Sequence, residues 1–232
     1  MSKIITLVKS SGMTRDEFRE YWRDVWLPSL LAVPETGDNL VRIVFNHVLP
    51  SNIRPDEEVP SDQWAGFAEM WYYDRPSAER FLASPGVQSA IAAHAEAIPE
   101  VVHLHVFEIA GWDRGTGKVA LKALNLFIPR DGMSRTEAQR YWSDEHLRET
   151  TRLGMSQKLS KYVQNHSFPD HRTADPRYDF AGGPEMWFES MEEAESIFAD
   201  EALLAELKED EVKFVDHSLT LVVEEEDVYP AR

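Results

Sequence analysis

The sequence has no cysteine, which excludes disulfides, thiolate metal sites and cysteine nucleophiles. Positive charge is also scarce: 24 lysines and arginines stand against 41 aspartates and glutamates, a formal net charge of −17. Nucleic acids and anionic membranes both require a basic surface, so we expect neither as a partner. No stretch approaches the roughly 18 apolar residues of a spanning helix, and the opening MSKIITL turns polar too early for a signal peptide. We therefore expect a cytoplasmic protein.

Motifs that hold nucleotides are missing as well. Gly115-Thr-Gly-Lys118 lacks the spacing of a phosphate-binding loop, and there is no dinucleotide fingerprint or serine-nucleophile elbow. We expect no cofactor. What the chain does have is 43% hydrophobic and 11% aromatic residues, enough for a substantial core. The acidic residues are spread along helical segments such as residues 201–211, the usual pattern of a solvated face.

Two segments 120 positions apart repeat one another. Residues 13–27 read MTRDEFREYWRDVWL and residues 133–147 read MSRTEAQRYWSDEHL, with seven of fifteen positions identical. Each opens with a capping box, Thr14-x-x-Glu17 and Ser134-x-x-Glu137, and continues with apolar residues at helical spacing. Both segments are therefore predicted to be amphipathic helices with a well-defined start.

The correspondence continues downstream in the same order. Phe45-Asn-His47 matches Gln164-Asn-His166, Glu69-Met-Trp71 matches Glu185-Met-Trp187, and His103 aligns with His217. Four motifs in a conserved order indicate a tandem duplication, with repeats over residues 1–112 and 118–232.

Each repeat is predicted to contain strand, helix, strand, strand, helix and strand, the ferredoxin-like βαββαβ order. The predicted strands are 4–8, 40–49, 67–73 and 101–109, then 121–128, 159–167, 184–188 and 219–223, with second helices at 76–97 and 191–213. One face of such a sheet stays bare, so we expect an α+β protein in which the two repeats form an intrachain α/β barrel. The connector is 111–119, and the long loops 50–66 and 168–183 are candidate pocket covers.

Three pairs of motifs, best seen in YWSDEH at 141–146, YVQNH at 162–166 and EMWF at 185–188, resemble the EthD-like family. That family belongs to the dimeric α/β-barrel superfamily, and the resemblance covers nearly the whole chain, once per repeat. It implies two ferredoxin-like units with a ligand pocket in each, between sheet and helices. Relatives include cofactor-independent monooxygenases, cyclases and isomerases; haem enzymes lie further away. The helix histidine of the family is present as His146, but the first repeat has Trp26 there.

Four residues are the candidate catalytic groups: His146, His166, Asn165 and His47. A neutral imidazole is a general acid or base at cellular pH, and the alternative is a buried histidine with structural hydrogen bonds. Trp26 at the equivalent helix position suggests that His146 faces an apolar space. We predict that His146 and His166 transfer protons, with Asn165 or nearby backbone groups stabilising an enolate or phenolate.

Other residues are candidates for binding. Trp71, Trp187 and Trp142 offer flat rings against a planar ligand, or else core packing. Arg172 and Tyr178 in the second long loop could bind a carboxylate or phenol, or be solvated. The alternating pair at 103 and 105 could ligate a metal, although a structural strand pair is the favoured interpretation and no metal is expected.

The expected function is a cofactor-independent lyase, isomerase or cyclase that acts on a small aromatic, phenolic or polyketide-like molecule in a hydrophobic pocket. The alternatives are a cofactorless monooxygenase on a phenolic substrate and a noncatalytic small-molecule binding or stress protein. We expect the second repeat to carry the activity, the halves not to fold separately, and a monomer or a homodimer.

Overall fold

The computed structural model describes residues 1–51, 53, 64–115 and 119–229. The fold is α+β, as predicted, and the hydrogen-bonded order of the strands is that of a closed barrel, β1-β3-β2-β8-β5-β7-β6-β4. Chain contacts divide the molecule into two compact units. The first comprises Met1–Val48, Asp62–Phe107 and Glu225–Arg232, and the second comprises Leu49–Ser61 and Glu108–Glu224.

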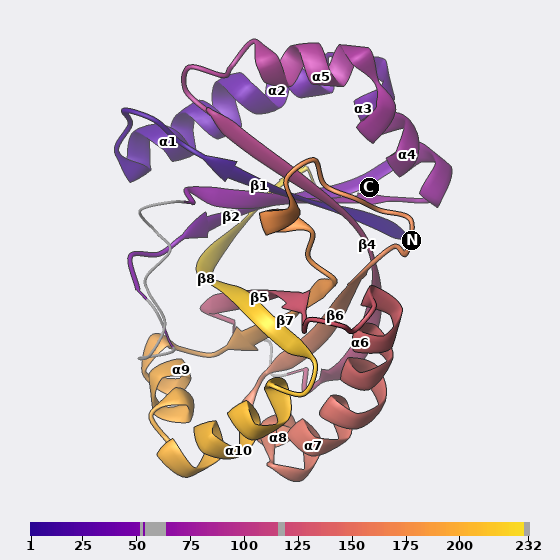
Figure 1. Ribbon diagram of the computed structural model, residues 1–232. Coiled ribbons are helices and arrows are strands. Elements are labelled where there is room, and N and C mark those ends of the chain that lie inside the picture. The colour runs from indigo at the N-terminus through magenta and orange to yellow at the C-terminus, as the bar shows by residue number, and fades with distance from the viewer. Residues whose placement is uncertain (52, 54–63, 116–118, 230–232) are drawn as a thin grey trace. The chain divides into compact units, whose positions relative to one another are not determined.

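In the described residues of the first unit, five α-helices lie on one side of the sheet (Figure 1). Its elements, in chain order, are β1 (Ser2–Lys9), α1 (Arg15–Tyr21), the π-helical turn η1 (Trp22–Trp26), α2 (Leu27–Leu31), α3 (Pro34–Gly37), β2 (Leu40–Val48), β3 (Gly66–Tyr72), α4 (Arg75–Ala83), α5 (Pro85–Ala92) and β4 (Glu100–Asp113). Strand β1 pairs antiparallel with β3 and β4, and β2 pairs antiparallel with β3.

The second unit repeats this order. Its elements are β5 (Leu121–Pro129), α6 (Arg135–Tyr141), the π-helical turn η3 (Trp142–His146), α7 (Leu147–Arg152), α8 (Met155–Lys158), β6 (Lys161–Ser167), the 3-10 turn η4 (Pro176–Tyr178), β7 (Gly182–Phe188), α9 (Met191–Phe198), α10 (Glu201–Glu211) and β8 (Val215–Tyr229). Strand β5 pairs antiparallel with β7 and β8, and β7 pairs antiparallel with β6. The predicted ferredoxin-like order is present in both units.

The last strand of each repeat is longer than predicted. Strand β4 runs on to Asp113, into the segment that the sequence suggested as a connector, and β8 begins at Val215 and ends at Tyr229. The first unit thus includes the end of β8, where Val228 and Tyr229 pack against its core, and the second includes the end of β4. Each unit is therefore completed by a strand that begins in the other.

The helix starts follow the predicted chemistry. Thr14 and Ser134 each accept a hydrogen bond from the backbone amide three residues on, and Glu17 and Glu137 bond back to the cap amides. The predicted second helices are each split in two. In the first repeat the break falls at Ser84-Pro85: proline opens α5 because it has no amide hydrogen to donate, and Ser84 caps that helix.

Each first helix changes to π-helical geometry at its tryptophan, over Trp22–Trp26 and Trp142–His146. π turns of this kind are rare and often lie at functional sites. His146 is the last residue of the second one, so its side chain leaves the helix from a locally widened turn.

Each sheet holds a buried ion pair on the face that points away from its helices. Lys122 Nζ lies 2.9 Å from Glu185 Oε1, with both side chains at most 1% exposed. Lys3 and Glu69 form the equivalent pair in the first unit. The burial of these four charged side chains is not indicated by the sequence pattern.

Strand register corrects one part of the internal alignment. Thr6 faces His103 across β1 and β4, and Asn125 faces Thr220 across β5 and β8. Because Lys3 and Lys122 occupy equivalent places, the counterpart of His103 is Thr220, and His217 lies three residues earlier on its strand. The sequence alignment pairs these two histidines, but they do not occupy equivalent positions in the two repeats.

Two of the predicted segments, the first long loop and the connector, lie partly outside the described residues. Residues 52 and 54–63 of the first long loop, and 116–118 of the connector, lie outside the described residues. No described helix is long and apolar enough to cross a membrane.

Candidate active site

Two small adjoining cavities lie between helices and sheet in the second unit, with volumes of about 40 and 30 Å³. The residues common to both linings are Asn125, His146, Pro184 and Glu211. The first cavity is otherwise lined by Trp112, Thr150, Met155, Leu159, Tyr162, Met186, Phe198 and Leu207, and the second by Phe127, Trp142, Phe214, Val215 and Ser218. Each exceeds the roughly 10–15 Å³ that one water needs. The walls are apolar and aromatic, with a few polar groups at the junction.

His146 is held by a buried carboxylate. Its Nδ1 lies 2.7 Å from Asp210 Oδ2, and the two residues are 7% and 4% exposed. With Nδ1 bound to Asp210, Nε2 is the nitrogen that remains for a ligand. A histidine that is oriented through one ring nitrogen and lines a cavity has the geometry of a general acid or base.

Asp210 is bound by two further groups. Tyr141 donates to Oδ1 at 2.7 Å and Lys213 Nζ donates to the same oxygen at 3.0 Å. These hydrogen bonds, that of His146 first, hold the pKa of Asp210 far below its usual value despite its burial. Burial and then the hydrogen bond to Asp210 raise the pKa of Tyr141. The carboxylate is therefore anionic, and both Tyr141 and Lys213 keep their protons.

His166 lies close by but plays a different part. Its ring stacks on Trp142, with centroids 4.6 Å apart and an interplanar angle of 22°, and its Nε2 is 3.0 Å from Gln164 Oε1. Burial lowers the pKa of His166 to about 4, so the ring is neutral at cellular pH. Among the described residues that line the two cavities, Trp142 is present and His166 is not.

The remaining candidate catalytic residues lie elsewhere. Asn165, fully buried on β6, donates from Nδ2 to the Gly183 carbonyl at 3.1 Å. It points to the opposite sheet face from His166, as strand alternation requires. His47, in the first unit, is 2.8 Å from Glu226 Oε2 and lies edge-on to Trp22. Burial lowers the pKa of His47, and Glu226 only partly opposes that shift.

Two of the candidate binding tryptophans pack under cations. Lys122 and Lys161 lie 5.3 and 4.8 Å from the ring centroid of Trp187, and Lys3 lies 4.9 Å from that of Trp71. Trp142 is the one of the three that lines a cavity around His146. Its indole donates to the Tyr162 hydroxyl at 3.2 Å.

The second long loop is fastened by Arg135 of α6. The guanidinium donates to the carbonyls of Phe168 and His171 and to Asp179 Oδ1, the last at 2.6 Å. Arg172 is exposed and donates to the backbone of the same loop, and Tyr178 packs against Phe180. The described residues lining the two cavities include none from this loop.

The two alternating histidines of β4 make separate hydrogen bonds. His103 Nδ1 lies 2.8 Å from Thr6 Oγ1, and His105 Nε2 lies 2.6 Å from Ser2 Oγ. Within the described residues, no group of three histidines or carboxylates is placed to hold a metal.

The first unit fills the equivalent space with rings. Trp26 is 1% exposed, and Trp22 stacks on Phe45 with centroids 3.9 Å apart. Tyr21, the counterpart of Tyr141, bonds instead to His94 at 2.6 Å. Trp26 packs in the apolar core of the first unit. The His146–Asp210 pair is thus specific to the second unit.

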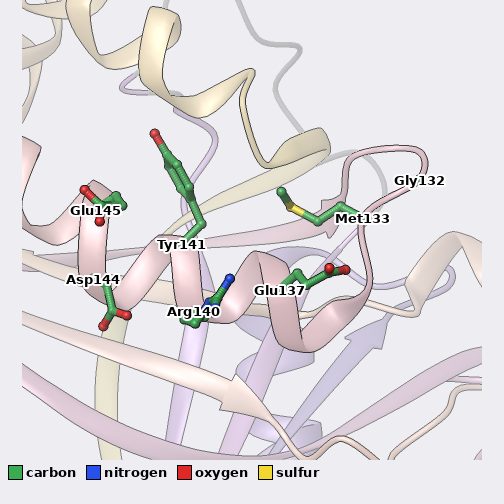
Figure 2. A pocket seen from close by; sticks show the side chains of 7 residues that line it. All are labelled: Gly132, Met133, Glu137, Arg140, Tyr141, Asp144 and Glu145. Carbon is green, nitrogen blue, oxygen red and sulfur yellow. The ribbon is translucent and has the colours of Figure 1, made fainter.

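A more open groove of about 410 Å³ lies outside this region, along α6 and the turn after it. Figure 2 shows Glu137, Arg140 and Asp144 along one helix, and Gly132 and Met133 in the loop that precedes it. Tyr141 also lines the groove, and its hydroxyl is the group that binds Asp210. Tyr141 therefore connects the groove with the His146–Asp210 pair.

The EthD domain model matches the chain twice, over residues 10–98 and 130–218, so the protein belongs to the EthD family. Comparison with curated proteins finds no match. Among solved structures, an anthrone oxidase-like protein is similar at TM-score 0.56 and 10% identity, with 98% of this chain and 93% of that chain covered. A candidate monooxygenase from Lactobacillus acidophilus NCFM is similar at TM-score 0.51 and 9% identity, with 100% and 99% covered. At these identities the likeness shows the fold alone.

Sequence reasoning missed Asp210. It lies in an acidic helix that the charge pattern suggests is solvated, 64 positions from His146. The available signal was helical spacing, because Leu203, Leu207 and Asp210 are the buried residues of α10. A carboxylate on the buried stripe of an otherwise acidic helix indicates a partner in the interior.

Proposed function

We propose that this protein is an acid–base enzyme, independent of a cofactor, whose active site is the pair of cavities around His146. The observation that carries the proposal is the buried His146–Asp210 pair, 2.7 Å apart, in which His146 lines both cavities. In this arrangement Asp210 fixes the imidazole orientation and His146 Nε2 takes and returns the substrate proton. Positioned proton transfer contributes roughly 10² to 10⁴ in rate.

The cavity walls favour a small aromatic, phenolic or polyketide-like substrate. Trp112 stacks on Tyr162 with centroids 4.6 Å apart, which gives a flat wall for a planar ring. Met155 and Met186 lie on the same cavity and are flexible side chains that adjust to a guest. Because the cavities are small, such movement has to accompany binding. The reaction class is a lyase, isomerase or cyclase.

The other candidate catalytic groups take supporting roles in this proposal. His166, neutral and stacked on Trp142, positions a ring that lines the cavity. Asn165 and His47 lie away from His146 and are proposed to maintain the fold. In this proposal the cavity walls, rather than Arg172 and Tyr178, bind the substrate.

The test is proton exchange in heavy water. The full chain is incubated with a panel of phenols and polyketide-like ketones, and loss of C–H signals is followed by NMR together with oxygen consumption. We expect exchange or conversion with the wild type, without oxygen uptake, and at least about a hundredfold slower with His146→Ala.

His217→Ala, at an exposed residue of β8, is the control and should leave the rate unchanged. Oxygen consumption that accompanies turnover would replace the proposed reaction with an oxygenase. Tight binding of a compound without exchange or conversion would indicate a noncatalytic binding protein.

A further inference from the structure

Among the buried polar atoms of the second unit that have no hydrogen-bond partner in the described residues, three lie at or beside the cavities around His146: Asn125 Oδ1, Thr220 Oγ1 and Trp112 Nε1. Asn125 lines both cavities around His146 and Trp112 lines the larger one. Thr220 is 3% exposed and directly faces Asn125 across β5 and β8. Buried polar atoms are normally paired, so three in one place require an explanation.

The first unit shows what the same strand positions do when they are structural. There Thr6 and His103, the counterparts of Asn125 and Thr220, hydrogen-bond each other at 2.8 Å. In the second unit the equivalent pair makes no such bond, although both its residues carry hydrogen-bonding groups. The duplication has therefore kept polar residues at this strand pair but left them unpaired only beside His146.

The chemistry of the three atoms defines a complementary ligand. Asn125 Oδ1 accepts, Trp112 Nε1 donates, and the Thr220 hydroxyl can do either. None of the described residues that line the two cavities is a lysine or arginine, while Glu211 is among them and Asp210 lies behind His146. These two carboxylates would repel an anion, whereas they would not repel an uncharged ring.

We infer that the unpaired atoms of Asn125 and Trp112 form a recognition site for an uncharged ring compound that bears both a hydroxyl donor and a carbonyl acceptor. The hydroxyl donates to Asn125 Oδ1, and the carbonyl accepts from Trp112 Nε1. The inference rests on the proposed function, since it names the substrate class of the His146 site. Asn125 is then the residue that determines specificity for the hydroxyl, beside the imidazole that would remove or supply a proton.

The experiment measures binding by calorimetry on the full chain, with four related probes. 4-Hydroxyacetophenone carries both groups, acetophenone lacks the hydroxyl, 4-ethylphenol lacks the carbonyl, and 4-hydroxybenzoate replaces the carbonyl with an anion. The pH is set so that the phenolic hydroxyls stay protonated. The wild type should bind 4-hydroxyacetophenone at least about fivefold more tightly than each of the other three, because each leaves a buried group unpaired or adds a charge.

Asn125→Leu should abolish the difference between 4-hydroxyacetophenone and acetophenone, and Trp112→Phe that between 4-hydroxyacetophenone and 4-ethylphenol. Thr6→Val, at the equivalent position of the first unit, is the control and should leave both differences intact. Equal binding of all four probes, or none, by the wild type overturns the inference, as does retention of both differences in Asn125→Leu and Trp112→Phe. Binding with these differences but without proton exchange overturns the proposed reaction and leaves the recognition site standing.

Discussion

The buried pair of Lys122 and Glu185 gives a prediction whose size follows from the structure. Lys122→Met removes an ammonium that lies 2.9 Å from a carboxylate only 1% exposed. Breaking a buried ion pair by removing one partner costs about 3–5 kcal/mol, because the other charge loses its compensation inside the fold. For a chain of this length, each kcal/mol corresponds to roughly 2–4 °C in melting temperature. Lys122→Met should therefore melt about 6–20 °C below the wild type.

The double variant Lys122→Met/Glu185→Leu separates charge from packing. Replacing both partners with apolar groups of similar size is often neutral, so most of the lost stability should return. Denaturant unfolding gives the free energies and calorimetry the melting temperatures. Lys3→Met, in the equivalent pair of the first unit, should show a loss of similar size. A double variant as unstable as the single one would refute the reasoning, since packing rather than uncompensated charge would then set the loss.

Three further predictions concern the site and the architecture. Asp210→Asn should lower turnover of an identified substrate at least about a hundredfold, through misorientation of the general base, while Asp216→Asn, at an exposed residue of β8, should not; equal rates would remove Asp210 from the mechanism. Because burial lowers the folded-state pKa of His166 to about 4 against an ordinary 6.5, its contribution to stability is present above pH 6.5 and is lost as the pH falls towards 4, by about 3 kcal/mol in all. His166→Gln should flatten that part of a pH series of denaturant melts, and an unchanged slope would contradict it. Residues 1–112 and 118–232 expressed separately should fail to give cooperative monomers, because each unit needs the end of a strand from the other; a cooperatively melting half would show otherwise.

The fold was predictable because its signals are local and repeated. The capping boxes at Thr14 and Ser134 define the helix starts, and β-branched and aromatic runs define the strands. The length of β8 was not predictable, since residues 224–227 are acidic and strand pairing rather than propensity holds them extended. The second helices break at Ser84-Pro85 and at Asp200 because new helix caps begin there, and the amphipathic pattern of the sequence does not reveal these caps.

The site was predictable only in part. His146 could be identified because the first repeat has Trp26 at the equivalent position, so a comparison of the two repeats singles this residue out. Its partner Asp210 could not be paired with it, because residues 64 positions apart meet only through tertiary packing. The π turn that carries His146 also has no signature in local sequence propensity. The stacking of His166 on Trp142 depends on side-chain geometry that the sequence does not specify.

The central claim is that proton transfer takes place at His146 in the second unit. Its most direct test is the turnover number of an identified substrate for His146→Ala and His47→Ala, with folding checked by thermal melts. The account predicts that His146→Ala lowers kcat at least about a hundredfold in a protein that still melts cooperatively. His47→Ala, which loses a buried hydrogen bond to Glu226, should lower the melting temperature and keep kcat near that of the wild type. Abolished activity in His47→Ala with near-normal kcat in His146→Ala would place the active site in the first unit and contradict the account.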